Sequence, residues 1–298
     1  MLIALTGGTG FVGGRALDRL VDAGHEVRAL TRRPRPARDG VAWIEGALDR
    51  SDSLDALVAG ADVVLHIAGV VNAPDRAGFA AGNIAGTHAV VDAAARVGVE
   101  RLVHVSSLAA REPALSDYGW SKAEAEHVVE ASPLVSTIVR PPAVYGPGDL
   151  EMRDMFRLAR LGLALLPPPG RMSAIAVDDL ARLLVSLVEQ RSARACYEPD
   201  DGCTYSHAEF ARAIGRAVGR RVLPLPLPAA LLRLGARIDG RLRGQRAKLT
   251  PDRAAYLTHP DWTADPARRP PPSLWAPRVD LAQGLADTAR WYADHGLL

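Results

Sequence analysis

The chain contains 298 residues, of which 48% are hydrophobic and 23% charged, and its formal net charge is +2. These proportions are those of ordinary folded proteins, and they exclude intrinsic disorder, a collagen-like repeat and a small disulfide-stapled scaffold. The length predicts one large domain, or a large domain with a smaller one, and the weak net charge gives no indication of nucleic-acid binding.

The N-terminal segment and the cysteine content predict a cytoplasmic protein. Residues 1–6 lack the basic start of a signal peptide and run directly into a glycine turn, as a buried strand does. The two cysteines, Cys196 and Cys203, cannot form a disulfide framework in a chain of this length. No stretch approaches the roughly 18 apolar residues of a membrane span. We therefore expect no membrane span, no nucleic-acid partner and a small-molecule substrate.

The first half of the chain alternates short apolar runs with longer amphipathic segments. Strands are expected at 2–6, 26–31, 41–45, 62–68, 102–106 and 135–139. Helices are expected at 11–23, 51–59, 77–97 and 117–131. Nearly continuous apolar strands separated by helices indicate a parallel sheet that is covered on both faces. The fold class predicted is therefore α/β, a doubly wound parallel sheet of the Rossmann type.

After residue 142 this alternation ends. Prolines cluster at 167–169, 224–228 and 266–272, and no regular strands separate the helices expected at 152–161, 177–190, 207–218 and 280–295. We predict a dinucleotide-binding domain over residues 1–146, to which 174–195 returns. A smaller, mostly helical substrate-binding region is expected over 147–173 and 196–298. Its basic stretch 233–248 is interpreted as a solvated helix face, with a helix lying on a membrane surface as the alternative.

A glycine-rich turn joins the first strand to the first helix. Gly8, Gly10 and Gly13 match G-x-G-x-x-G, and Gly7, Gly10 and Gly13 match the wider G-x-x-G-x-x-G. Both spacings keep side chains away from a helix N-terminus, so that pyrophosphate oxygens can approach its N–H groups. The position between a strand and a helix at the first βα turn therefore predicts dinucleotide binding.

The end of the second strand indicates which dinucleotide. A site for NAD places an acidic residue there to hold the ribose 2′-hydroxyl. This strand is followed instead by Arg32 and Arg33, whose guanidinium groups suit the 2′-phosphate of NADP. Because the chain has 34 arginines, two ordinary surface arginines are the alternative interpretation, and NAD then remains an option.

Tyr118 and Lys122 form a Tyr-x-x-x-Lys pair in an expected helix, and a spacing of four places both on one helix face. An ammonium near a phenol favours the ionised phenol, so Lys122 is expected to lower the pKa of Tyr118 and make it an acid–base group. Lys122 is one of only two lysines in the chain. Ser107 follows the strand at 102–106, at the carboxyl edge of the sheet where such folds bind ligands.

Other polar residues are given structural interpretations. His66 and His104 lie in apolar strands and are expected to be core histidines. Cys196, Cys203 and His207 have loose spacing and no further ligand nearby, so no metal site is expected.

Together these residues resemble the extended and atypical short-chain dehydrogenase/reductases, which are grouped as NAD-dependent epimerase/dehydratases. The resemblance covers nearly the whole chain. Besides the glycine turn and Tyr-x-x-x-Lys, the matching motifs are HIAG at 66–69, NIAGT at 83–87, VSS at 105–107, RPPAVYGP at 140–147, VDDLA at 177–181 and PRVD at 277–280.

The resemblance implies a role for each matching position. Tyr118 would be the catalytic acid–base group, Lys122 would lower its pKa and hold the nicotinamide ribose, and Ser107 would polarise the substrate oxygen. The remaining cofactor contacts implied are Thr9, Phe11, Val12, Ala68, Pro141 and Val144. The family often has Gly-Asp-Leu after the third strand, where this chain has Ala47, so adenine recognition is assigned to Leu48 and its neighbours. Many relatives are dimers, so a homodimer is one state that the resemblance allows.

Three functions follow from these expectations. The first is an NADP(H)-dependent oxidoreductase that interconverts a ketone and a secondary alcohol, with Tyr118 transferring the proton. The alternative is a nucleotide-sugar epimerase or dehydratase with tightly bound NAD(P). The second alternative is a non-catalytic NADP(H)-binding protein, against which the intact Ser107, Tyr118 and Lys122 set argues.

Overall fold

The computed structural model describes residues 1–190, 194–244, 247 and 249–298. The chain divides into two compact units. The first unit comprises Met1–Arg140, Leu180–Glu198 and Pro270–Ala276. The second unit comprises Pro141–Asp179, Pro199–Arg269 and Pro277–Leu298.

The first unit is built on a seven-stranded sheet in the order β11-β6-β5-β4-β1-β2-β3, with every neighbouring pair parallel. The strands are β1 (Leu2–Thr6), β2 (Glu26–Thr31), β3 (Val41–Glu45), β4 (Val63–His66), β5 (Arg101–Val105), β6 (Val135–Val139) and β11 (Ala195–Tyr197). From β1 the chain adds β2 and β3 on one side and then β4, β5 and β6 on the other, which is the strand order of a doubly wound Rossmann sheet. The predicted fold class is confirmed. The edge strand β11 was not predicted, because three residues are too short to show a pattern.

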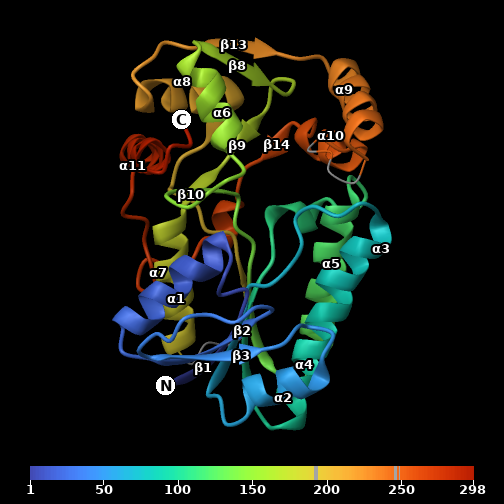
Figure 1. Cartoon of the computed structure of the whole chain (residues 1–298), viewed down its shortest axis with the longest axis vertical. Helices are drawn as coiled ribbons and strands as arrows, with labels where there is room; N and C mark the ends of the chain where they lie inside the picture. The colour runs from blue at the N-terminus through green and yellow to red at the C-terminus, as the bar shows by residue number, and fades with distance from the viewer. Residues whose placement is uncertain (191–193, 245–246, 248) are drawn as a thin grey trace. The chain divides into compact units, whose positions relative to one another are not determined.

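Helices cover both faces of this sheet (Figure 1). On one face lie α1 (Phe11–Asp22) and α7 (Val177–Glu189), and on the other lie α2 (Ser51–Val58), α4 (Gly86–Arg96) and α5 (Asp117–Ala131). Between the sheet and the second group of helices, a core of buried side chains includes Leu57, Val64, Val90, Leu102 and Ile138. Burial of apolar surface on both faces explains why the strands are nearly continuous hydrophobic runs.

The single helix expected at 77–97 is interrupted. It consists of α3 (Arg76–Phe79), a π-helical segment η1 (Ala80–Ala85) and α4. Short π-helical segments within α-helices are often found at functional sites. Here the π-helical segment carries Asn83 into a buried position. A short 3₁₀ helix, η2 (Leu108–Arg111), links β5 to α5.

The second unit combines helices with three small sheets. The sheets pair β7 (Ala143–Tyr145) with β10 (Ala174–Ala176), β8 (Leu163–Leu166) with β13 (Leu223–Pro226), and β9 (Arg171–Met172) with both β12 (Tyr205–Ser206) and β14 (Asp261–Trp262). The helices are α6 (Arg153–Arg160), α8 (His207–Ala217), α9 (Ala229–Arg243), α10 (Pro251–Leu257), the short 3₁₀ helix η4 (Pro266–Arg268) and α11 (Leu281–Asp294). Its core includes Tyr145, Phe156, Phe210, Leu285 and Tyr292. The sequence did not predict these strands, because none exceeds four residues.

Candidate active site

The glycine turn excludes side chains at two positions. Gly7 has a φ of +77°, and a Cβ there would lie 2.7 Å from the backbone nitrogen of Ala68. A Cβ at Gly13 would lie 2.0 Å from the Gly7 carbonyl oxygen, because α1 begins directly against the turn. Only glycine therefore fits at either position.

The N-terminus of α1 is open to a ligand. Gly10 is the N-cap and provides no side-chain hydrogen bond to the helix. Thr9 and Gly10 are exposed, and Phe11 and Val12 are half-buried. The first N–H groups of a helix lack intrahelical partners and carry the positive end of the helix dipole. This end of α1 can therefore hold an anionic group such as a pyrophosphate.

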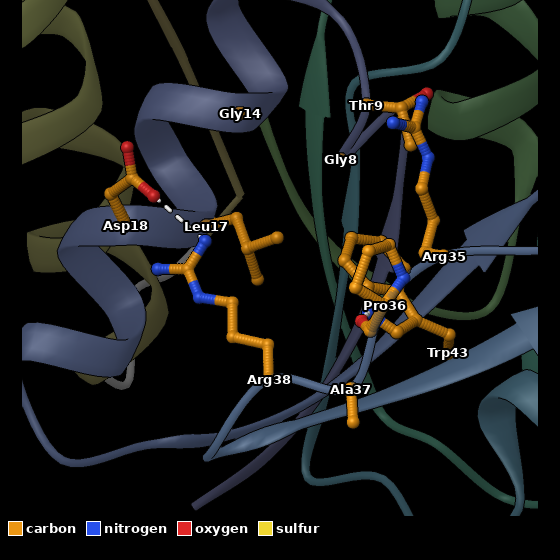
Figure 2. A pocket seen from close by; sticks show the side chains of 10 residues that line it. All are labelled: Gly8, Thr9, Gly14, Leu17, Asp18, Arg35, Pro36, Ala37, Arg38 and Trp43. Carbon is orange, nitrogen blue, oxygen red and sulfur yellow. Dashed lines mark hydrogen bonds and ion pairs between the residues drawn. The ribbon is translucent and has the colours of Figure 1, made fainter.

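A cavity of about 510 Å³ opens beside this turn. Gly8, Thr9 and Gly14 line it from the turn and α1, and Arg35, Arg38 and Trp43 line it from the segment after β2 and from β3. Figure 2 shows the Arg35 side chain extending toward Thr9, whereas Arg38 is paired with Asp18 at 2.8 Å. The cavity combines a helix N-terminus with a guanidinium group and an indole.

The arginines expected to select the cofactor lie in the same loop. Arg32 and Arg33 are exposed, and the Thr31 hydroxyl donates a hydrogen bond to the Arg33 carbonyl at 2.7 Å. Neither side chain is among those that line the cavity, whereas Arg35 and Trp43 are. The sequence interpretation overlooked these two. The third arginine of the run Arg32-Arg33-Pro34-Arg35 was the pattern that could have found the first of them.

Leu48 and Ala68 lie at the carboxyl ends of β3 and β4. Leu48 is half-buried and packs against the core, with its Cδ1 2.7 Å from where a Cβ on Gly86 would lie. The backbone N–H of Ala68 donates to the Thr6 hydroxyl at 3.2 Å, which fixes the segment against the glycine turn. Both residues therefore lie at the edge of the sheet where the resemblance places cofactor contacts.

Ser107 and Tyr118 are brought together by η2 and α5. Ser107 is the N-cap of η2, where its hydroxyl accepts a hydrogen bond from the Ala109 N–H at 3.2 Å. It also forms a side-chain hydrogen bond with Tyr118. Tyr118 is in the first turn of α5, whose N-cap Ser116 accepts a hydrogen bond from Gly119 at 3.0 Å. A hydroxyl and a phenol thus share one site.

Lys122 follows one turn later in α5 and is 5% exposed. Its ammonium donates to the Val105 carbonyl oxygen at the end of β5, at 2.9 Å. The same ammonium lies 3.8 Å from where a Cβ on Gly69 would be, so it also reaches the segment that follows β4. Lys122 therefore connects α5 to the carboxyl edge of the sheet.

The pKa of Tyr118 shifts in the direction opposite to the one expected. Burial raises the pKa of the phenol above its ordinary value, and the hydrogen bond with Ser107 only opposes that shift. Burial also lowers the pKa of Lys122 to about 8, against an attraction to Glu126. Desolvation thus outweighs the hydrogen bond with Ser107, and Tyr118 is protonated at neutral pH.

Asn83 joins three segments around the site. Its side-chain oxygen accepts from the Val70 N–H at 2.8 Å, and its amide donates to the Val70 carbonyl at 3.0 Å and to the Ser121 hydroxyl at 2.9 Å. The Ser121 hydroxyl donates in turn to the Tyr118 carbonyl at 2.8 Å. The π-helical segment thus fixes the loop after β4 to the turn of α5 that carries Tyr118.

His66 and His104 are fully buried beneath the site, with stacked rings 5.2 Å apart. The His66 ring nitrogens contact the hydroxyls of Thr6 at 2.6 Å and Thr87 at 3.0 Å. Burial, assisted by the charge of Lys122, lowers the pKa of His66 to about 3 and that of His104 well below its ordinary value. Both rings are neutral at physiological pH and form part of the core.

Pro141 and Val144 belong to the second unit. Pro141 is buried, and Val144 pairs with Ile175 where β7 meets β10.

Cys196 is half-buried and Cys203 is exposed, and both are free thiols. Across the described ranges no three His, Cys, Asp or Glu side chains are grouped to hold a metal ion. A search of the same ranges finds no helix with the length and apolar character needed to cross a bilayer.

Comparison with known proteins places this geometry in context. The sequence pattern described as the NAD dependent epimerase/dehydratase family matches residues 3–198. A ceramide reductase of Caulobacter vibrioides is 36% identical over 100% of this chain and 96% of its own length. Among solved structures, MoeE5 in complex with UDP-glucose and NAD has a TM-score of 0.78 at 22% identity, covering 99% of both chains. The human epimerase family protein SDR39U1 with NADPH has a TM-score of 0.77 at 21% identity, covering 97% of this chain and 99% of that one. These two structures share the fold.

Proposed function

This chain belongs to the NAD dependent epimerase/dehydratase family, and from that premise we propose that it is an NADP(H)-dependent oxidoreductase that interconverts a ketone and a secondary alcohol. The observation that carries the proposal is the shared site of Ser107, Tyr118 and Lys122. A hydroxyl bonded to a protonated phenol, with a buried ammonium one helical turn away, is a proton-donating site.

The glycine turn is assigned to the cofactor pyrophosphate. The space that a Cβ at Gly7 or Gly13 would fill is closed, and the open N-terminus of α1 supplies N–H donors. The residues proposed to contact the cofactor are Gly7, Thr9, Gly10, Phe11, Val12, Gly13, Leu48, Ala68, Tyr118, Lys122, Pro141 and Val144. When bound, the nicotinamide exchanges a hydride with the substrate carbon.

The arginines that follow β2 favour NADP over NAD, because only NADP carries a 2′-phosphate. Arg32 and Arg33 remain proposed ligands of that phosphate, and Arg35 joins them because it lines the cavity beside Thr9. Charge-assisted hydrogen bonds from guanidinium groups suit a phosphate dianion, and residues 32–38, which follow β2 directly, include no carboxylate to hold a free ribose hydroxyl.

In the reductive direction Tyr118 gives its hydroxyl proton to the carbonyl oxygen as the substrate carbon receives the hydride. The raised pKa of the phenol keeps this proton in place at neutral pH. The Ser107 hydroxyl, bonded to the phenol, orients the substrate oxygen. Lys122 positions the ribose and supplies positive charge near the phenolate that forms. The product is a secondary alcohol, and the phenol regains its proton from solvent.

The substrate class proposed is a ketone carried by a ceramide-type lipid. The support is the ceramide reductase of Caulobacter vibrioides, whose similarity extends over both chains almost completely. A nucleotide-sugar epimerase is the alternative, since the family name includes epimerases.

The experiment that tests the function measures two quantities together. The purified protein is mixed with NADPH and a ceramide that carries a ketone, and the loss of reduced-nicotinamide absorbance is compared with the alcohol formed. Equal amounts of both are expected, and NADH should be used less efficiently. Sugar inversion without net NADPH consumption would replace the proposal with an epimerase. Cofactor-induced thermal stabilisation without turnover on any ketone or sugar would replace it with a binding protein.

A further inference from the structure

Helix α9 of the second unit carries an uncovered apolar stripe. Leu231, Leu234, Ile238 and Leu242 follow one another at spacings of three, four and four, which places them on one helix face. Their exposed fractions lie between 47 and 80%. Four large aliphatic side chains aligned on one exposed face are unusual, because scattered single residues are the norm at a surface.

The stripe is not the face by which α9 packs onto its own unit. Leu232 and Ala236, which lie on another side of the helix, are buried together with Ala254 of α10. Leu227 and Leu249 pack against this small core. Helix α9 therefore packs onto its own unit through the face that carries Leu232 and Ala236. The stripe is a second apolar face, and it is exposed.

A row of arginines runs beside the stripe. Arg233, Arg237 and Arg241 repeat at a spacing of four, and Arg237 and Arg241 each follow a stripe residue by three positions. All three are exposed, and within the described ranges no carboxylate is paired with them. The helix contains four arginines and one acidic residue, Asp239, which pairs with Arg243 at 3.3 Å. Its excess positive charge is therefore three.

We propose that α9 docks this protein on the surface of a bilayer that contains anionic lipids. The apolar stripe would enter the boundary between headgroups and acyl chains, and the neighbouring arginines would extend their guanidinium groups to lipid phosphates. A second copy of this chain fits less well, because in an antiparallel pairing the two arginine rows would face each other with like charge and in a parallel pairing they would remain without an anionic partner. The anionic bilayer surface matches both the stripe and the row.

The proposed docking goes beyond the oxidoreductase chemistry, since it rests on α9 alone. It is tested with the whole 298-residue chain, without cofactor or substrate, by flotation with vesicles. One set of vesicles is phosphatidylcholine alone, and the other is an equimolar mixture of phosphatidylcholine and phosphatidylglycerol. We expect flotation with the anionic vesicles, weaker flotation with the neutral ones, and a loss of binding at high salt.

Two variants of α9 and one control separate the contribution of the apolar stripe to vesicle binding from that of the arginine row. Leu234→Gln with Ile238→Gln should reduce the vesicle partition coefficient by at least roughly tenfold, because two apolar side chains leave the stripe. Arg237→Gln with Arg241→Gln should reduce it by roughly thirtyfold on anionic vesicles only. Arg212→Gln with Arg216→Gln, the same charge change at exposed positions on α8, should leave binding unchanged. Thermal unfolding should be alike in all four proteins, because the substituted side chains are exposed.

Three results would overturn the docking proposal. One is the absence of wild-type flotation with anionic vesicles. Another is equal flotation of the wild type and both α9 variants. The third is a concentration-dependent dimer that Leu234→Gln with Ile238→Gln abolishes, without any vesicle binding, which would assign the stripe to contacts between copies. None of these results depends on turnover, so failure of the docking proposal leaves the proposed function to its own test.

Discussion

The two units of this molecule are specified by their sequences in different ways. In the first, strands of three to six residues pair in one parallel seven-stranded sheet, and the glycine turn, Ser107 and Tyr118 follow individual strands. In the second, three small sheets join strands that are distant in the chain, such as Met172 with Tyr205 and with Trp262. Chemistry that depends on one strand end can be predicted locally, whereas a surface built from long-range pairings cannot.

The largest effect is expected at the glycine turn. Gly13→Ala would place a Cβ 2.0 Å from the Gly7 carbonyl oxygen, so the turn must open. We expect a loss of about 3 kcal/mol in the free energy of unfolding and no measurable NADPH binding. Calorimetric titration and chemical denaturation check both values.

The control for that change is the next residue. Gly14→Ala meets only an ordinary contact, 3.7 Å from the Gly8 carbonyl oxygen, and alanine favours the helix. It should keep the turn closed and stabilise the protein slightly. Similar losses in both variants would contradict the close-approach explanation of the turn.

The loop after β2 should decide between the two cofactors. Arg35→Gln is expected to weaken NADPH binding by about ten- to a hundredfold and to leave NADH binding unchanged, because only NADPH carries the 2′-phosphate. Arg38→Gln is the matched control, since Arg38 is already paired with Asp18. If Arg32→Gln or Arg33→Gln weakens NADPH binding while Arg35→Gln does not, the assignment made from the sequence replaces the one based on the cavity.

The buried ammonium of Lys122 is expected to lower the free energy of unfolding at neutral pH, although the proposed activity needs it. Its pKa is lowered to about 8 in the folded protein, while the unfolded chain keeps the ordinary 10.5. Between these pH values the folded protein releases a proton that the unfolded chain retains, so the stability of the wild type rises with pH across this window. Below about pH 8 both states are charged and only the folded state is penalised.

Lys122→Met removes that titration. The variant should exceed the wild type in free energy of unfolding by roughly 1–3 kcal/mol at pH 7, and the difference should shrink as the pH rises from about 8 to 10. Denaturation at several pH values measures it. A difference that does not change with pH would show that the ammonium is not desolvated.

The smallest effect is expected in the second unit. The Tyr292 hydroxyl is buried, and no side chain or backbone group of the described structure forms a hydrogen bond with it. Tyr292→Phe should therefore change the free energy of unfolding by less than about 1 kcal/mol, and it should not lower stability. A loss of more than about 2 kcal/mol would show that the hydroxyl has a partner in solution.

The sequence predicted the parts of the fold that depend on local patterns. The strands at 2–6, 26–31, 41–45 and 135–139 coincide with β1, β2, β3 and β6, because each is a short apolar run between clear turns. The π-helical segment around Asn83 was missed, since no local pattern indicates that Asn83 contacts Val70 and Ser121. The strands of the second unit were missed because each has four residues or fewer, too short to show a pattern.

For the candidate site, the sequence identified residue types better than their electrostatics. The spacing of Tyr118 and Lys122 indicated a pair on one face of a helix, but no spacing reports that burial raises the phenol's pKa. Arg35 and Trp43 were missed because the cavity they line depends on the path of the loop after β2. The sequence pattern therefore located the candidate site, whereas the protonation state of Tyr118 follows from how the side chains pack around it.

The central claim is that Tyr118 transfers the proton. Tyr118→Phe should lower the rate of NADPH-dependent ketone reduction by about 10²- to 10⁴-fold while NADPH still binds. Tyr197→Phe, the same change at a half-buried tyrosine in β11, should keep the wild-type rate. Full activity in Tyr118→Phe, with NADPH binding unchanged, would contradict the account.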